Sequence, residues 1–156
     1  MRVLVIGCGA NVERELSQVD RSSFDCIIGV NRAALLYGPV DLHVTLHPET
    51  YARQKQARLI SWRAMEGVDE VFDFAWRKHG NSGSSGLYAV KYALERLNAE
   101  SVTLAGVGID KGPHIYSTSD WAQAEQFQKT WIEVVDKLRG RVFSLGGWTA
   151  KLLNEE

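Results

Sequence analysis

Short apolar runs recur along the chain, and most of them end in a glycine or a polar residue. Runs of this length bounded by turn-forming residues are typical of strands buried in a parallel sheet. We therefore expect strands at residues 3–6, 25–30, 41–46, 68–74, 101–105 and 141–145. Stretches with helical spacing lie between them, so the chain alternates between strand and helix, as an α/β protein does.

Apolar residues also recur at the three- and four-residue spacing of a helix. One stripe (Leu87, Val90, Ala93 or Leu94, Leu97) predicts a helix whose other face is polar, with Asn98 as its left-handed terminator. A second stripe predicts a long amphipathic helix over residues 119–138. Residues 49–57 also fit a helix, whereas residues 58–67 fit either a covering helix or a loop.

Length and composition agree with one compact domain. A chain of 156 residues with 45% hydrophobic content can bury roughly 70% of its unfolded surface without disulfides. No composition shift, repeat or linker divides the chain. We predict a single Rossmann-like, nucleotide-binding α/β domain over residues 1–156, with three layers and a mostly parallel sheet.

The charge balance and the cysteines argue against several classes of protein. A net charge of −1 from 18 basic and 19 acidic residues gives no general reason to bind nucleic acid or an acidic membrane. Cys8 and Cys26 lie in or beside apolar strands, which favours reduced thiols in a cytoplasmic protein over a disulfide framework. There is no apolar run of about 18 residues that predicts a membrane span.

Two glycine-rich loops carry the candidate chemistry. Residues 81–86 run into the predicted helix, and free amides at a helix start attract an anion. Gly7 and Gly9 follow the first strand, but Val12 replaces the third glycine of a dinucleotide-binding loop, and Asn31 replaces its ribose-binding acid. NAD binding is therefore disfavoured. Neither loop contains a Walker lysine or the G-x-S-x-G spacing of a serine hydrolase.

The order of these motifs resembles that of the bacterial sialyltransferases that use CMP-sialic acid. It also resembles a wider Rossmann-like group that includes pterin pyrophosphokinases. The likeness spans residues 7–11, 24–32, 84–88, 106–110 and the tail at 147–153. It implies a nucleotide site, with CMP favoured, formed by Gly7, Gly9, Asn11, Asn31, Ser84, Ser85, Gly86 and Asp110.

The chain also departs from that family. Cys8 stands where the family usually has an asparagine, and residues 111–118 replace a sizeable lid. The acceptor machinery is therefore reduced. The resemblance implies that His114 is the catalytic base, that Tyr116 binds phosphate during catalysis, and that His47 faces the substrate.

Structural roles compete with binding roles at these positions. Ser84 and Ser85 fit a helix cap, Asn31 fits the N-cap of the following helix, and Asp110 fits a turn cap. His43 and His47 are four residues apart, roughly 13 Å along a strand, which excludes a shared metal. We expect no metal and no cofactor.

The sequence favours a glycosyltransferase-like protein that transfers a sugar from a CMP-sugar donor. One alternative is a non-catalytic module that binds or sequesters a nucleotide, which the short segment after Asp110 favours. Another is a phosphotransfer enzyme, although the chain shows no obvious carboxylate cluster for Mg²⁺. Aromatic residues around Trp62 and Trp76 are candidates for a contact between copies in a homo-oligomer.

Overall fold

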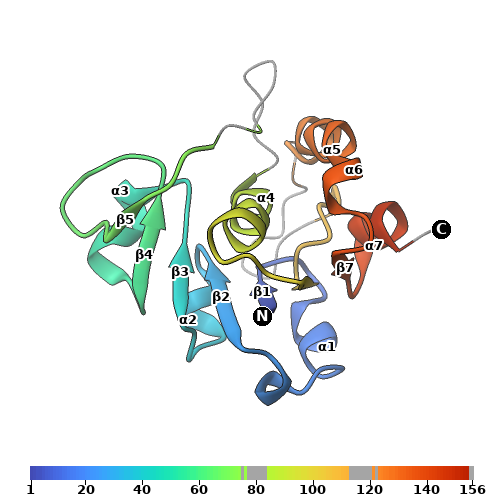
Figure 1. Cartoon of the computed structure of the whole chain (residues 1–156), viewed down its shortest axis with the longest axis horizontal. Coiled ribbons are helices and arrows are strands. Elements are labelled where there is room, and N and C mark those ends of the chain that lie inside the picture. Colours follow the sequence, from blue (N-terminus) through green and yellow to red (C-terminus); the bar gives the residue numbers. More distant parts are fainter. Residues whose placement is uncertain (75, 77–83, 113–120, 122, 155–156) are drawn as a thin grey trace.

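The fold is a single parallel sheet with helices on both faces (Figure 1). The computed structural model describes residues 1–74, 76, 84–112, 121 and 123–154. In these residues the sheet has seven strands in the order β5-β4-β3-β2-β1-β6-β7. They are β1 (Arg2–Ile6), β2 (Cys26–Val30), β3 (Leu42–Val44), β4 (Arg58–Ser61), β5 (Glu70–Val71), β6 (Ser101–Ala105) and β7 (Val142–Ser144).

Seven α-helices connect the strands within the described residues. They are α1 (Val12–Leu16), α2 (Ala33–Leu36), α3 (Pro48–Tyr51), α4 (Ser84–Lys91), α5 (Ala124–Glu133), α6 (Val135–Leu138) and α7 (Gly147–Leu153). Short 3-10 turns occupy Arg21–Ser23 and Ala52–Gln54, and one π-helical turn, Tyr92–Arg96, follows α4. The left-handed terminator is confirmed, because Asn98 has a φ of 54°.

Strand β1 lies at the centre and is buried on both faces. Val3 and Val5 pack into the cluster that holds α4 and Trp131, whereas Leu4 and Ile6 pack against Val12 and other residues of the opposite face. Successive side chains of a strand point to opposite faces, so these two clusters are the two sides of the sheet. The three-layer, Rossmann-like α/β fold is confirmed.

The strand order changes direction beside β1. The chain runs outward from β1 through β2, β3, β4 and β5, and then returns to place β6 and β7 on the other side. Ligands of open α/β sheets bind at such a switch point, outside the carboxyl ends of the strands. The loops that follow β1 and β6 are therefore the expected walls of a site.

Two strands differ from the expectation. Strand β4 falls inside residues 58–67, which fitted a helix or a loop, and β5 has two residues where seven were expected. Leu59, Ile60 and Ser61 are all 0% exposed. A parallel strand that is covered on both faces has no polar alternation, and the serine interrupts its apolar run.

The polar face predicted for this helix is found only in part, because Glu95 is exposed whereas Lys91 is buried. Tyr88, Lys91 and Tyr92 are buried together with the apolar stripe, because the segment after β5 covers them. The hydroxyl of Tyr88 donates to the carbonyl oxygen of Phe72 at 2.7 Å, and Lys91 Nζ donates to that of Asp73 at 2.8 Å.

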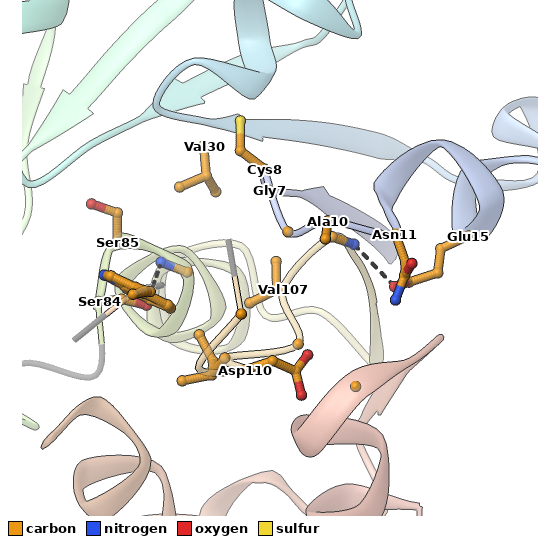
Figure 2. A pocket seen from close by; sticks show the side chains of 18 of the residues that line it. Gly7, Cys8, Ala10, Asn11, Glu15, Val30, Ser84, Ser85, Val107 and Asp110 are labelled. Carbon is orange, nitrogen blue, oxygen red and sulfur yellow. Dashed lines mark hydrogen bonds between the residues drawn. The ribbon is translucent and has the colours of Figure 1, made fainter. Parts of the chain in front are cut away.

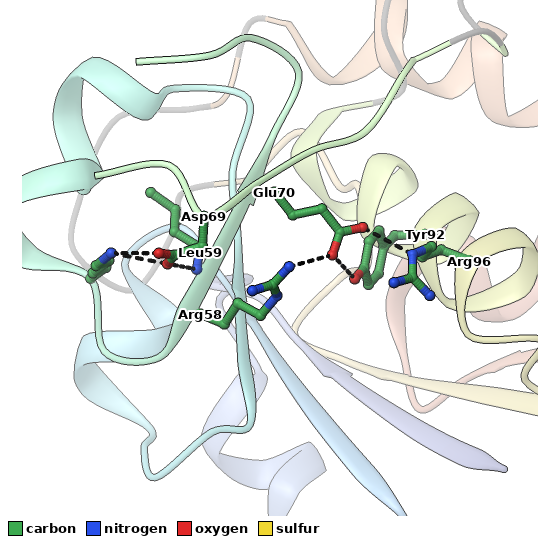
Figure 3. A network of polar contacts seen from close by, with 7 residues as sticks. Arg58, Leu59, Asp69, Glu70, Tyr92 and Arg96 are labelled. Carbon is green, nitrogen blue, oxygen red and sulfur yellow. Dashed lines mark hydrogen bonds and ion pairs between the residues drawn. The ribbon is translucent and has the colours of Figure 1, made fainter. Parts of the chain in front are cut away.

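Glu70 joins β5 to β4 and to the π-helical turn after α4 (Figure 3). Its carboxylate accepts from Tyr92 Oη at 3.0 Å, from Arg58 at 3.2 Å and from Arg96 at 3.1 Å. These partners hold the pKa of Glu70 below its usual value, against the desolvation that raises it. The side chains of three elements therefore meet on one carboxylate.

The C-terminal part of the chain closes the other edge of the sheet. The long helix expected over residues 119–138 is divided at Val134 into α5 and α6. Ala124, Trp131 and Leu138 are buried as expected. Asn154 follows α7, and its amide pairs with both backbone groups of Ser144 in β7, at 3.2 Å and 2.8 Å. Among the described residues, no helix is long and apolar enough to cross a membrane.

Candidate functional site

A cavity of about 340 Å³ lies at the carboxyl ends of the central strands (Figure 2). Its walls are the loops after β1 and β6, the end of β2, and the first residues of α4 and α7. All eight residues that the sequence predicted as nucleotide-binding line it: Gly7, Gly9, Asn11, Asn31, Ser84, Ser85, Gly86 and Asp110. The volume falls within the range of small-molecule sites, about 300–1,000 Å³.

The two strand-end loops touch through their backbones. The amide of Gly9 donates to the carbonyl oxygen of Gly106 at 2.8 Å, and a Cβ on Gly7 would lie 2.6 Å from the same oxygen. Gly106 has a φ of +71°, a region that side chains disfavour. Glycine is therefore required here by close contact between loops as well as by turn geometry.

Ser84 and Ser85 begin α4 on one side of the cavity, opposite Asn11 and Glu15 (Figure 2). Ser84 Oγ accepts the amide of Gly86 at 3.3 Å, which is a local capping contact. Ser85 Oγ accepts the amide of Leu46 at 3.0 Å and so ties α4 to the end of β3. Both serines thus have structural partners while lining the cavity.

Asn31 ends β2 with a φ of 52°. Its side chain does not cap α2, which begins after Arg32 without a side-chain cap. Instead, Asn31 Oδ1 accepts from Thr45 Oγ1 at 2.6 Å. The alternative of a helix-capping asparagine is therefore wrong, and a side contact to β3 replaces it.

Asp110 has a capping role in addition to lining the cavity. Its Oδ1 accepts the amide of Trp148 at 2.9 Å, in the first turn of α7. A carboxylate at a helix start is stabilised by the unpaired amides there. Gly108 and Gly147 leave room for this carboxylate, because a Cβ on either would meet Oδ2 at 2.3 Å. Asp110 therefore fixes α7 against the loop after β6.

Glu15 lines the cavity and was not anticipated. It is 3% exposed, and its Oε1 accepts the amide of Gly106 at 3.1 Å. Burial raises the pKa of this carboxyl, and the charge of Asp110 raises it further, against the hydrogen bond from Gly106. Glu15 follows Val12 by three residues, the spacing of a buried stripe, and that spacing was the available signal.

Cys8 also lines the cavity. Burial raises the pKa of its thiol to about 12, against the lowering charge of Arg32. Because the thiolate is the nucleophilic form of cysteine, this burial disfavours a nucleophilic role for Cys8 at neutral pH.

Of the three remaining predicted site residues, the described structure shows the position of His47 alone. His47 precedes α3, its side chain is 60% exposed, and it is absent from the described cavity lining. His114 and Tyr116 lie outside the described residues. Of the described residues, the amide of Trp121 donates to the carbonyl oxygen of Lys111 at 2.8 Å.

No cluster of three or more His, Cys, Asp or Glu side chains suited to a metal occurs in the described part of the chain. His43 is 0% exposed, and both its ring nitrogens are engaged. Its Nδ1 accepts the amide of Gln56 at 3.3 Å, so Nε2 carries the proton and donates to the carbonyl oxygen of Asn31 at 2.9 Å. His43 therefore has a hydrogen-bonded, structural role inside β3.

The chain matches no protein-family model and no curated protein sequence. Its structure is similar to that of a mammalian sialyltransferase, with a TM-score of 0.60, 15% identity and coverage of 94% of this chain and 69% of that chain. A mammalian sialyltransferase in complex with Gal-beta-1-3GalNAc-ortho-nitrophenol gives a TM-score of 0.59, with the same identity and coverage. The chain therefore has a sialyltransferase-like fold, although these neighbours are mammalian rather than bacterial.

Proposed function

We propose that the cavity binds a nucleotide, with CMP favoured, and that the protein transfers a sugar from a CMP-sugar donor. One observation carries the proposal. Eight residues from four separate segments converge on one cavity, at the switch point of a sialyltransferase-like sheet. The closeness of these residues is what a nucleotide site requires, and the fold makes a glycosyltransferase the first activity to test.

The amides at the start of α4 are the candidates for phosphate binding. Ser84, Ser85 and Gly86 supply this end of the helix, and the positive end of the helix dipole favours an anion. The facing loop, Gly7 to Asn11, brings backbone close to the same space. Asn31 is then the candidate for contact with the ribose or the base.

The catalytic roles remain as the sequence suggested them. His114 would accept the proton of an attacking hydroxyl, and Tyr116 would stabilise the departing phosphate. His47 would contact the substrate from its position before α3, outside the described cavity lining.

Thermal shift with CMP, UMP, AMP, NAD and a pterin tests nucleotide binding. A ligand at about 100 times its Kd adds roughly 2.7 kcal/mol to stability. We expect CMP to give the largest shift. Asn31→Gly should reduce it, and Asn98→Gly should leave it unchanged. This control is matched because Asn98 is also left-handed but does not line the described cavity. If no nucleotide gives a shift, the proposal fails.

Turnover is tested by measuring CMP release from a CMP-sugar, with and without a hydroxyl acceptor. We expect release to depend on the acceptor. His114→Ala should abolish turnover and preserve the CMP shift, because a base acts on the acceptor rather than on the nucleotide. Full turnover in this variant would remove His114 from the mechanism.

A non-catalytic, nucleotide-binding module is the second candidate. In the sequence, only residues 111–118 separate Asp110 from the expected long helix, so few residues are available to enclose an acceptor and exclude water. CMP binding without release from any CMP-sugar would favour this function over transfer.

A further inference from the structure

Three consecutive residues of the β3 segment hold Asn31. Its amide donates to the carbonyl oxygen of Val44 at 3.1 Å, and its carbonyl oxygen accepts from His43 Nε2 at 2.9 Å. Thr45 Oγ1 donates to Asn31 Oδ1 at 2.6 Å. His43 and Thr45 are both 0% exposed. These contacts maintain a left-handed asparagine at the edge of the cavity.

Hydrogen-bond polarity determines which end of the Asn31 amide faces Thr45. The hydroxyl of Thr45 has one proton, and its oxygen already accepts the amide of His47 at 2.9 Å. Turning the Asn31 amine towards Thr45 would give that oxygen two donors and leave its own proton without an acceptor. The 2.6 Å separation also fits an O–H···O bond better than an N–H···O bond. Oδ1 is therefore the atom that faces Thr45.

The other end of the Asn31 amide is the amine nitrogen, Nδ2, which points away from Thr45 when Oδ1 faces it. In the described residues, no hydrogen bond uses Asn31 Nδ2. Asn31 lines the cavity together with Ser85 and Gly7. An asparagine offers both a donor and an acceptor, but here Thr45 already occupies one of the two lone pairs of Oδ1. The amine is therefore the end of the side chain that is left to bind a ligand.

We propose that Thr45 is a positioning residue that fixes Asn31 as a hydrogen-bond donor to the ligand. The group it selects is an acceptor, namely a ribose hydroxyl oxygen or a pyrimidine carbonyl. This inference rests on the proposed nucleotide site and adds the polarity of one of its contacts. It concerns the orientation of one amide, which is measurable without ligand.

The ligand-free test uses the side-chain amide signals of Asn31 in ¹⁵N–¹H spectra, assigned by their loss in Asn31→Gly. Thr45→Val keeps the shape of the side chain and removes the hydroxyl. We expect the Asn31 signals to shift in Thr45→Val and to stay near their wild-type positions in Thr45→Ser. Unchanged signals in Thr45→Val would overturn the proposal, whether or not CMP binds.

The ligand test is a double-mutant cycle, read as the Kd for CMP by calorimetry. Thr45→Val should weaken CMP binding by roughly three- to tenfold, the value of one hydrogen bond. Thr45→Ser, which keeps the hydroxyl, should bind CMP with nearly the wild-type Kd. In the Asn31→Gly background, Thr45→Val should have no further effect, because no amide is left to orient. Glycine tolerates the left-handed backbone at this position.

A merely structural role for Thr45 predicts a different pattern, in which Thr45→Val weakens binding equally with and without the Asn31 side chain. That result would overturn the inference. If Thr45→Val does not fold, Asn31→Asp replaces the amine with oxygen and keeps an acceptor for Thr45. Its Kd for uncharged cytidine should rise, and an unchanged Kd would contradict the proposal. If the wild type binds neither CMP nor cytidine, the proposed function fails, and the amide signals alone decide the role of Thr45.

Discussion

Lys91 Nζ donates a 2.8 Å hydrogen bond to the carbonyl oxygen of Asp73, from a side chain that is 5% exposed. The same ammonium lies 4.1 Å from the centre of the Phe72 ring and 3.5 Å from Glu95. A buried charge requires such partners. The segment after β5 is therefore attached to α4 through a cation.

Replacing Lys91 by methionine should destabilise the protein. Methionine retains much of the apolar stem, so the main losses are the hydrogen bond to Asp73 and the contact with the Phe72 ring. We expect the free energy of unfolding in urea to fall by about 1–3 kcal/mol. Lys129→Met, the same change at an exposed position of α5, should have little effect. Equal losses in the two variants would contradict this role.

Gly86→Ala should destabilise the protein although alanine favours a helix. A Cβ at this position would lie 2.7 Å from Val107 Cγ1. Overpacking costs about 1–3 kcal/mol, which exceeds the gain of roughly 0.5–1 kcal/mol from helix propensity. Urea unfolding measures the difference.

Two further variants locate the cause of the Gly86 effect. Gly112→Ala, where nothing lies within 4 Å of the added Cβ, is the control and should be close to neutral. Gly86→Ala combined with Val107→Ala should be more stable than the sum of the single losses, because the second change removes the clashing atom. Simple additivity would show that the clash is not responsible.

Glu15→Gln should change how stability depends on pH. Folding raises the pKa of Glu15 above its ordinary value of 4.5. Between pH 4.5 and the raised pKa, the folded state therefore binds more protons than the unfolded state. Stability therefore falls as pH rises through that interval. Glutamine keeps an oxygen for the Gly106 amide and cannot ionise, so the variant should lack this fall.

Urea unfolding from pH ~4 to ~8 tests the sign. The stability of Glu15→Gln relative to wild type should increase across that range. Glu13→Gln, on the exposed side of α1, should show no such increase. A relative stability that decreases with pH would mean that the carboxylate, rather than the acid, is the form favoured in the fold.

Asn154→Ala should expose the last strand of the sheet. The Asn154 amide occupies both backbone groups of Ser144, and an unpaired edge is a template for another chain. We expect a loss of about 1 kcal/mol and concentration-dependent association in light scattering. Lys151→Ala, at an exposed position of α7, should remain as wild type. Association at the same concentrations in both variants would show that the edge is not the cause.

The sequence predicted the cavity lining better than the outer strands. Glycine and serine loops after apolar runs are local signals, and Gly7, Gly9 and Ser85 all line the cavity. Strand β4 has no local signal, because a serine is usually exposed and Ser61 is buried only with a hydrogen-bond partner, the carbonyl oxygen of Thr45. The pattern along the chain does not contain that partner.

The sequence also did not predict the roles of residues whose partners are distant in the chain. The interior position of Lys91 depends on the segment after β5, which is 18 residues away in the chain. The contact of Thr45 with Asn31 depends on the pairing of β2 with β3. Neither polar side chain shows this role in the sequence, because the packing of α4 gives Lys91 its partner and the pairing of β2 with β3 gives Thr45 its partner.

Main-chain atoms form much of the cavity wall, because many of the lining residues are glycines. Of the nineteen described residues that line the cavity, seven are glycines, and at several of them a side chain would collide with a neighbouring loop. The shape of a wall made of peptide groups depends on the strands and turns that position the main chain, and on the absence of side chains at these glycines. The neighbouring side chains determine the chemistry of the cavity more than its outline.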